Sequence, residues 1–296
     1  MKWMKGIGLL LIANVLIFVT LSITFTVLLN IVLPAFGIDL RGAVTQQDLL
    51  WALVIGFGCA FISLAFSKQI ARRMLSCVQI TQPRTQAERV IYGAVQEIAQ
   101  RMRIQMPEVW VYESPDPNAF ATGPSKNNSM VAVSTGLLSN MNEQEVRAVL
   151  AHEMGHVYNG DMFTSTVLAG LMNTFVYFIS QWVYRHLAER NQALALVVYF
   201  FLQTILSFLA MIPIAWFSRR REFGADAFAA KTYGKDAMIG ALRTIDAWVK
   251  RAQVEYSTQD ALATMKISGN TGGIMHLFAT HPPIENRIAA IQRLPF

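Results

Sequence analysis

The chain contains little cysteine and little charge. Only 2 of its 296 residues are cysteines, and no Cys-x-x-Cys pair occurs, so neither a disulfide framework nor a thiolate zinc site is favoured. Charged residues make up 15% of the chain, whereas hydrophobic residues make up 53%, and the mean hydropathy is +0.36. This composition argues against an ordinary soluble domain and indicates a membrane protein.

Two kinds of motif are also missing. The net charge is +6, but the sequence contains no nucleic-acid-binding motif, and much of the positive charge lies beside apolar runs, where it sets membrane orientation. No nucleic-acid partner is therefore expected. A Gly-x-Ser-x-Gly nucleophile elbow is absent as well, so a covalent serine mechanism is not indicated.

Four long apolar runs predict membrane spans, at about residues 6–33, 49–66, 162–183 and 193–217. The first run is too long for a cleaved signal peptide, so we expect a retained anchor. The positive-inside rule then places both termini and both polar blocks in the cytosol. The basic residues on the cytosolic side are Lys2, Lys5, Lys68, Arg72, Arg73 and Arg219 to Arg221, against Arg41, Arg185 and Arg190 on the other side. Alternatively, the last two runs form a hairpin that is partly buried in protein.

The apolar runs divide the chain into four segments. Residues 1–75 form an anchor pair, 76–160 a first polar block, 161–218 a second hydrophobic hairpin and 219–296 a second polar block. In the first polar block, apolar residues over 87–102 follow the helical period, and β-forming residues cluster at 108–112 and 130–134. We therefore expect a mainly helical α+β domain beside the membrane.

Residues 152–156 read His-Glu-Met-Gly-His. On a helix, His152 and His156 share one face and can bind one zinc ion, while Glu153 can take a proton from water that the metal activates. Asn142 is a suitable N-cap and Gly160 a suitable C-terminal residue, so the motif is predicted to lie inside a helix between them. The alternative is a helix whose histidines simply pack in a core.

A catalytic zinc site needs a third protein ligand. A histidine soon after His156 is missing, and His186 falls in the predicted outer loop. The better candidate is Glu222, with Asp226 on the same helix face, where Asp226 would accept a hydrogen bond from a zinc-bound histidine. The alternative is a solvated acidic pair on a surface helix.

These motifs, taken with residues 118–121 and the sequence Thr280-His281-Pro282-Pro283, resemble those of the HtpX-type heat-shock membrane metalloproteases, relatives of the CAAX prenyl proteases. The resemblance covers essentially the whole chain. It implies a gluzincin-like catalytic domain with four transmembrane helices. It also implies one zinc ion per chain, with ligands His152, His156 and Glu222.

The resemblance implies further roles in substrate binding and catalysis. Asn118, Ala119 and Phe120 would belong to an edge strand that holds the substrate by β-addition, which agrees with the physics of peptide recognition. His281 would stabilise the oxyanion, and Arg287 would brace the site. Without the resemblance, residues 118–121 would be an ordinary strand or turn and His281 a loop histidine.

The predicted function is that of a membrane-integrated zinc endopeptidase. By the resemblance, it degrades misfolded or damaged membrane proteins at the cytosolic face of a bacterial inner membrane, with the lipid bilayer and other quality-control proteases as candidate partners. Residues 253–273 are a candidate mobile loop over the cleft, with plain disorder as the alternative. The rival functions are a narrow-specificity peptide-processing protease and a non-proteolytic membrane assembly factor that binds zinc.

Overall fold

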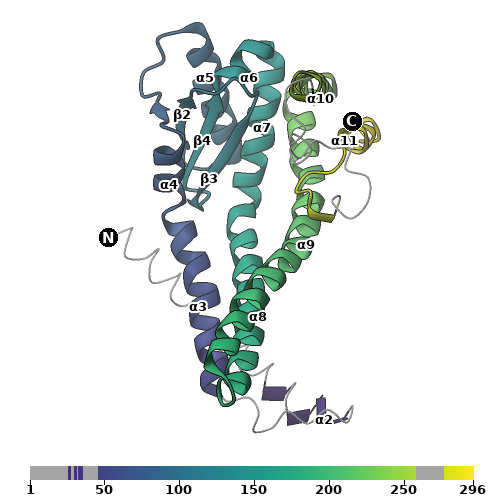
Figure 1. Cartoon of the computed structure of the whole chain (residues 1–296). Helices are drawn as coiled ribbons and strands as arrows, with labels where there is room; N and C mark the ends of the chain where they lie inside the picture. The colour runs from purple at the N-terminus through teal and green to yellow at the C-terminus, as the bar shows by residue number, and fades with distance from the viewer. Residues whose placement is uncertain (1–25, 28–29, 32, 36–45, 258–276) are drawn as a thin grey trace, which may run out of the picture. The chain divides into compact units, whose positions relative to one another are not determined.

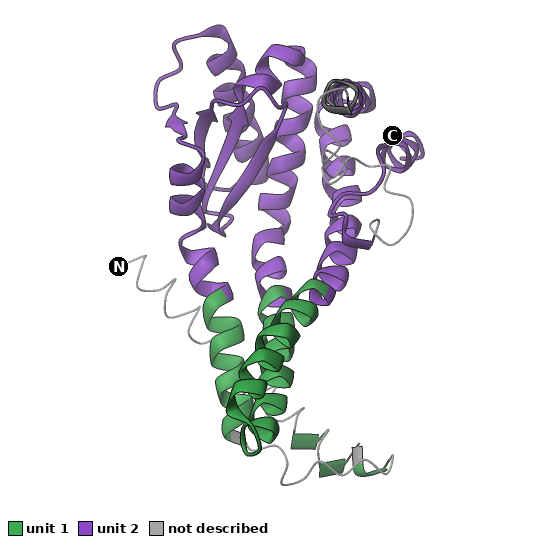
Figure 2. Ribbon diagram, in the orientation of Figure 1, with its two compact units in different colours: residues 1–59, 169–208 green, residues 60–168, 209–296 purple. Residues whose placement is uncertain are grey.

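A computed structural model describes residues 26–27, 30–31, 33–35, 46–257 and 277–296 (Figure 1). The predicted span at 6–33 therefore lies almost wholly outside the described residues, as does the predicted loop from residue 258 onward. The chain separates into two compact units (Figure 2). Unit 1 comprises residues 1–59 and 169–208, and unit 2 comprises residues 60–168 and 209–296.

Within the described part of the chain, three helices are long and apolar enough to cross a membrane, judged by length and composition. They are α3 (Gln46–Ala65), α8 (Asp161–Ala188) and α9 (Gln192–Tyr233), which correspond to the predicted spans at 49–66, 162–183 and 193–217. The short helix α2 (Leu33–Ala35) precedes them. Large apolar side chains such as Val197, Phe200 and Phe201 of α9 are exposed, as expected for a lipid-facing surface.

One detail of the predicted hairpin was wrong. We expected a polar loop over about residues 184–192, but α8 continues to Ala188 and α9 begins at Gln192. His186 therefore lies in the last turn of α8, where its Nδ1 is 2.9 Å from the carbonyl oxygen of Trp182. We expected a loop because residues 184–192 are polar, but polar residues can have sufficient helix propensity to extend a helix.

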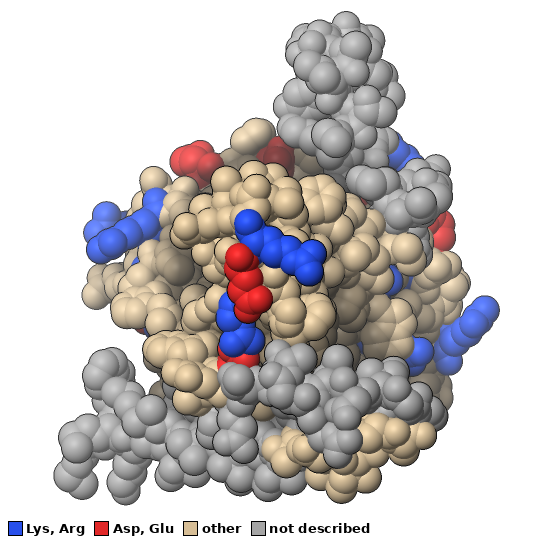
Figure 3. Space-filling view, turned by 60° about the horizontal axis from the view of Figure 1, so that its bottom comes forward, with Lys and Arg blue, Asp and Glu red and all other residues tan. Residues whose placement is uncertain are grey.

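The helices of unit 1 pack closely. A Cβ atom on Gly56 of α3 would lie 2.3 Å from Thr174 Oγ1 of α8, so only glycine allows this approach of the two backbones. Arg185 and Asp48 pair across the same two helices at 2.5 Å. The face turned forward in Figure 3 is largely uncharged apart from a short row of acidic and basic side chains.

Unit 2 contains a four-stranded sheet with the order β1-β2-β4-β3. The strands are β1 (Val78–Gln79), β2 (Glu108–Tyr112), β3 (Ala119–Ser125) and β4 (Asn128–Ser134). β4 pairs parallel with β2 and antiparallel with β3, so β3 forms one edge of the sheet. The strands predicted at 108–112 and 130–134 are confirmed.

The sheet is contacted by α4 (Ser67–Met74), α5 (Gln86–Met102), α6 (Thr135–Asn140) and α7 (Glu143–Asn159). Helix α10 (Lys235–Ser257) packs against α7, and α11 (Ile284–Gln292) packs against α10. The predicted amphipathic helix is α5, in whose apolar stripe Ile91, Val95 and Ile98 are fully buried. The core formed by these helices and the sheet gives α7 a fixed position.

Helix α7 is the central element of unit 2, and it contacts α5, α10 and the edge strand β3 (Figure 1). Its N-terminus has a capping box in which Asn142 and Glu145 satisfy each other's backbone amides. Its C-terminus ends at Gly160, whose φ of 70° lies in the left-handed region that favours glycine. Both predicted ends are confirmed, and the His-Glu-Met-Gly-His segment lies inside the helix.

Candidate metal centre

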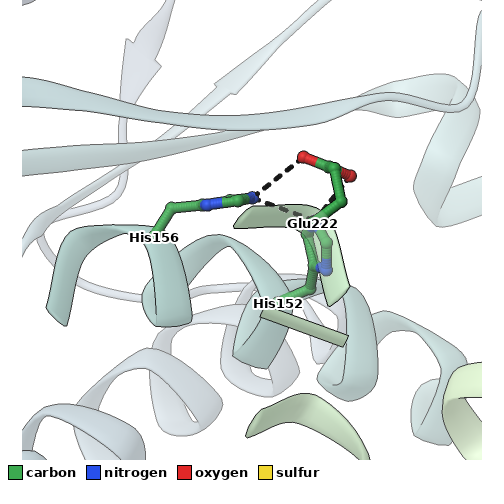
Figure 4. Close-up of side chains that lie close together, drawn as sticks. All are labelled: His152, His156 and Glu222. Atoms are coloured by element: carbon green, nitrogen blue, oxygen red, sulfur yellow. Dashed lines mark hydrogen bonds and ion pairs between the residues drawn. The ribbon is translucent and has the colours of Figure 1, made fainter. Parts of the chain in front are cut away.

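Three side chains from two helices converge in unit 2 (Figure 4). His152 and His156 are one turn apart on α7, and Glu222 reaches them from α9. The two Nε2 atoms are 3.2 Å apart, His156 Nε2 is 3.2 Å from Glu222 Oε1, and His152 Nε2 is 3.5 Å from Glu222 Oε2. Two nitrogens and a carboxylate therefore face one point.

This arrangement fits a single metal ion. Donor atoms about 2.0–2.1 Å from a tetrahedral ion lie about 3.3 Å from one another. The three separations in the cluster fall close to that value. His152 and Glu222 are almost fully buried, so water does not screen their interactions, and a cation offsets the cost of burying the carboxylate. These three residues could hold a metal ion.

His152 is oriented by Asp226 and Arg287. Asp226 lies one turn after Glu222 on α9, and its Oδ1 is 2.9 Å from His152 Nδ1. Arg287 of α11 donates two hydrogen bonds to the Asp226 carboxylate, from Nη2 at 2.6 Å and from Nε at 2.8 Å. Arg287 Nη1 also lies 3.3 Å from Glu222 Oε2. The structure thus brings both predicted supporting residues to the cluster.

His156 has a corresponding partner that the sequence analysis missed. Asp161, the first residue of α8, places its Oδ2 2.6 Å from His156 Nδ1. Arg221 of α9 donates to the backbone oxygen of Asp161 at 2.5 Å. The signal for Asp161 was an acidic residue directly after the helix-ending Gly160, where the left-handed turn brings the chain back toward the last turn of α7.

The charged groups of the cluster shift one another's pKa values. Burial disfavours the charged form of His156, but the hydrogen bonds that its ring donates to the carboxylates of Asp161 and Glu222 outweigh burial and raise the pKa of His156 to about 10. Burial also raises the pKa of Glu153 above its usual range, although the neighbouring histidines oppose the shift. A buried carboxyl with a raised pKa is suited to accepting and releasing a proton.

Glu153 contacts the edge strand. The backbone amide of Ala121 in β3 donates a hydrogen bond to Glu153 Oε2 at 3.1 Å. This amide points away from β4 and toward the metal cluster. The edge of β3 therefore runs beside the candidate base, the arrangement that β-addition of a peptide requires.

The structure places the three predicted substrate-binding residues around this edge. The backbone of Asn118 is already paired with Ser134, whose amide donates to the Asn118 carbonyl oxygen at 2.9 Å. Phe120 packs against Tyr112, with ring centroids 5.9 Å apart. Ala119 contacts the main core of unit 2. Ala121 is the last residue of the segment 118–121 that was predicted to hold the substrate, and its amide is the one that meets Glu153.

His281 reaches the cluster from the segment before α11. Its Nδ1 lies 2.7 Å from Glu222 Oε2, and its side chain is 63% exposed, so the ring is accessible from solvent while touching a buried carboxylate. Arg219 holds this segment to α9 through hydrogen bonds to the carbonyl oxygens of Leu277 and Ala279, at 3.2 and 2.5 Å. All the predicted catalytic and metal-binding side chains thus lie within one cluster.

Comparison with known proteins agrees with this geometry. Residues 85–294 match the model of Peptidase family M48. Protease HtpX homolog of Methylacidiphilum infernorum is 42% identical and covers 98% of this chain and 99% of its own length. Protease HtpX of Pasteurella multocida is 43% identical, over 95% of this chain and 98% of its own. Relatives therefore match along nearly the full length.

A solved structure shares the fold. The crystal structure of Ste24p from S. mikatae superposes with a TM-score of 0.56 at 18% identity, over 82% of this chain and 56% of that one. A peptidase match, a metal-ligand cluster and apolar helices together define a membrane metalloprotease. The chain belongs to Peptidase family M48, and the HtpX-type resemblance predicted from its motifs is confirmed.

Proposed function

We propose that the protein is a zinc-dependent endopeptidase that degrades misfolded or damaged membrane proteins. The observation that carries the proposal is the convergence of His152, His156 and Glu222, with Glu153 next to them on the same helix. This is the ligand and base set of a metallopeptidase, in a chain whose relatives are named proteases. We infer one zinc ion per chain.

The donor set supports zinc over other ions. Two imidazole nitrogens and one carboxylate are typical of catalytic zinc, whereas Ca²⁺ takes six to eight oxygen ligands. Structural zinc sites are usually closed by four protein ligands. Among the residues that the structure describes, the cluster offers three. A zinc ion with three protein ligands keeps a fourth coordination position for water or substrate, which catalysis needs.

Bound zinc would supply Lewis acidity toward a water molecule and toward a peptide carbonyl. In this mechanism Glu153 accepts the proton of the attacking water and later delivers it to the leaving amine. Its raised pKa suits both transfers, because the carboxyl must gain and lose the proton in one cycle. Asp226 and Arg287 hold His152 in place during these steps.

The edge strand supplies the substrate site. A peptide in extended form would add to β3 along Asn118, Ala119 and Phe120, with main-chain hydrogen bonds giving affinity without sequence preference. His281 would donate a hydrogen bond to the developing oxyanion, since its exposed ring touches Glu222 at the rim of the cluster. Broad backbone recognition suits a protease that clears damaged proteins.

The membrane topology is proposed from the basic residues and the apolar runs. Four transmembrane helices, with the first at 6–33, put both termini and the active site on the cytosolic side of a bacterial inner membrane. Helix α9 has 42 residues, which gives it a length of about 63 Å, roughly twice the hydrocarbon thickness. Glu222 can therefore belong to the same helix as the span 193–217 and still lie outside the hydrocarbon.

The catalytic domain in this proposal is gluzincin-like and made of two segments. Residues 76–160 carry the histidines and Glu153, and residues 219–296 carry Glu222 and the C-terminal residues. Residues 1–75 form the anchor pair, and residues 161–218 form the second hydrophobic hairpin. Only Gly160 separates α7 from α8, which favours substrates at or near the membrane surface.

Two other functions remain as alternatives. A protease with a narrow membrane-peptide substrate would use the same cluster, and only a substrate screen separates it from the proposed function. A membrane assembly factor with structural zinc would retain the histidines but would not need Glu153. The open ligand set favours an enzyme.

The test is degradation of a loosely folded substrate by the detergent-purified protein. The protein is purified with chelator to limit self-cleavage and then given zinc. We expect zinc-dependent cleavage by the wild type. The Glu153→Gln variant should bind zinc and lose at least about a hundredfold in cleavage rate, because it cannot accept the proton.

The control is zinc content, measured as zinc per chain for both proteins. Normal turnover by Glu153→Gln would contradict the mechanism. No cleavage by either protein, with one zinc bound to each, would shift the weight to the narrow-specificity protease or the assembly factor.

A further inference from the structure

Each histidine of the cluster has its own carboxylate, and each carboxylate has its own arginine. His152 faces Asp226, which Arg287 holds. His156 faces Asp161, which Arg221 holds. The first set was expected from the sequence and the family resemblance, whereas the second set was recognised only in the folded structure.

Asp161 is placed with little freedom to move. It is the first residue of α8, directly after the left-handed Gly160, and only 9% of it is exposed. Its Oδ2 is 2.6 Å from His156 Nδ1, the shortest contact that either histidine makes with a carboxylate. A carboxylate at the N-terminus of a helix is also favoured by the helix dipole.

Arg221 fixes Asp161 from the neighbouring helix. Its Nη1 donates to the Asp161 backbone oxygen at 2.5 Å and lies 3.7 Å from Oδ1, while its Nη2 donates to Ser165 Oγ at 2.5 Å. The guanidinium also lies 4.9 Å from the ring of Phe217, one turn earlier on α9. The arginine is thereby held on several sides.

We propose that Asp161, held by Arg221, is a positioning residue that fixes the ring of His156 for metal binding. By accepting the Nδ1 hydrogen of His156, Asp161 orients the ring so that Nε2 is aimed at the point where His152 and Glu222 also face, and a bound metal would displace the Nε2 proton. The inference rests on the proposed zinc site and adds residues to its supporting shell.

Arg221 also links α9, which carries the third candidate ligand, to the start of α8. Arg221 directly precedes Glu222, so the arginine that bonds the start of α8 belongs to the same turn of α9 as the third candidate ligand. Loss of Arg221 would loosen the position of His156 and that of Glu222 together. If Arg221 only held α8 and α9 together, its loss would affect folding but not metal affinity.

The test measures zinc affinity of the full chain in detergent, by competition with a chromophoric chelator. We expect Asp161→Ala to weaken zinc binding about 10- to 100-fold, with Asp161→Asn and Arg221→Gln nearer to the lower end, because such outer partners typically contribute that much. Replacement of zinc by Co²⁺ gives a second readout, since the visible absorption bands change when a ligand ring is misoriented. Excess zinc should restore cleavage by Asp161→Asn.

Two variants serve as matched controls. Arg220→Gln removes the same charge from the residue next to Arg221. The side chain of Arg220 lies over the ring of Trp216, 4.9 Å from its centroid. Glu143→Gln removes an acid from the far end of α7, where Glu143 pairs with Arg147. Both should bind zinc and Co²⁺ as the wild type does.

Wild-type zinc affinity and an unchanged Co²⁺ spectrum in Asp161→Ala would overturn the inference and leave the zinc site standing. If Asp161→Ala fails to fold, judged by the melting of the metal-free protein, the near-isosteric Asp161→Asn variant decides in the same way. A wild type that binds no zinc would overturn the proposed function, and this inference with it.

Discussion

Gly155 shows how a single residue positions the candidate site. A Cβ atom at this position would lie 3.3 Å from Ala225 Cα and 3.4 Å from the ring of Phe228, both on α9. Ala225 follows Glu222 by three residues, so the glycine lets α9 approach α7 at the point where Glu222, the third candidate ligand, lies beside the histidines. The fourth position of the motif is thus constrained by packing, although its side chain takes no part in the chemistry.

A larger residue at position 155 should weaken both the fold and metal binding. We expect Gly155→Val to lower the free energy of unfolding by about 1–3 kcal/mol, as overpacking usually does. We also expect lower zinc affinity, because α9 must move away from α7. Chemical unfolding and chelator competition measure the two effects.

The matched control is Gly93→Val in α5, since a Cβ atom there meets nothing within 4 Å. Valine has a higher helix propensity than glycine, so this variant should be neutral or slightly stabilising. Equal behaviour of the two valine variants would show that the contact with α9 is not tight.

At the scale of elements, a cluster of charges attaches α4 to the sheet. Lys68 Nζ donates to Glu108 Oε1 at 2.6 Å and to Asn128 Oδ1 at 2.7 Å, and Arg72 bonds the other oxygen of Glu108. Arg72 also lies 4.6 Å from the ring of Trp110. Burial alone would raise the pKa of Glu108, but the two cations outweigh it and hold its pKa below the usual range.

This attachment predicts a pH dependence of stability. Because the pKa of Glu108 is lower in the folded chain, its contribution is fully present above the unfolded pKa of about 4.3 and is lost as the pH falls through the folded value. The wild type should therefore unfold at a higher temperature than Glu108→Gln at about pH 6, and the gap should close toward about pH 3. A gap that stays constant over this range would mean that the carboxylate charge plays no part.

The elements that sequence patterns predicted are those with strong periodicity or clear ends. Helix α7 has recognisable capping residues at both ends, Asn142 and Gly160, and α5 has an apolar stripe at helical spacing. Strand β1 has only two residues and α6 only six, which is too short for a periodic signal. The candidate site was predictable to the extent that its residues form motifs. The contact between the Ala121 amide and Glu153 is a tertiary contact that no local pattern encodes, whereas Asp161 lies only five residues after His156 and its one local signal, an acid directly after Gly160, is too weak to assign its role.

At the scale of the molecule, the cluster joins segments that are distant in the sequence. α7 supplies two candidate ligands, α9 the third, and α11 the arginine that holds Asp226. A bound metal therefore acts as a cross-link among these elements, and such binding adds its free energy to folding when the unfolded chain has no site.

Zinc should consequently stabilise the protein. At a zinc concentration one hundred times the dissociation constant, the expected gain is about 2.7 kcal/mol. It should appear as a higher melting temperature in detergent that chelator reverses. The Glu222→Gln variant, which lacks the third ligand, should show little of this gain, and an equal gain in that variant would place the metal elsewhere.

The order of these residues along the chain also has a consequence for biosynthesis. The motif on α7 is synthesised first, Glu222 follows only after the hydrophobic hairpin, and Arg287 comes nine residues before Phe296. At about 5–20 residues per second, on the order of ten seconds separates the synthesis of the first ligand from that of the last supporting arginine. Throughout that interval the nascent chain has its two histidines but neither Glu222 nor Arg287, so a centre of this design would become complete only after both histidines had waited for residues made much later.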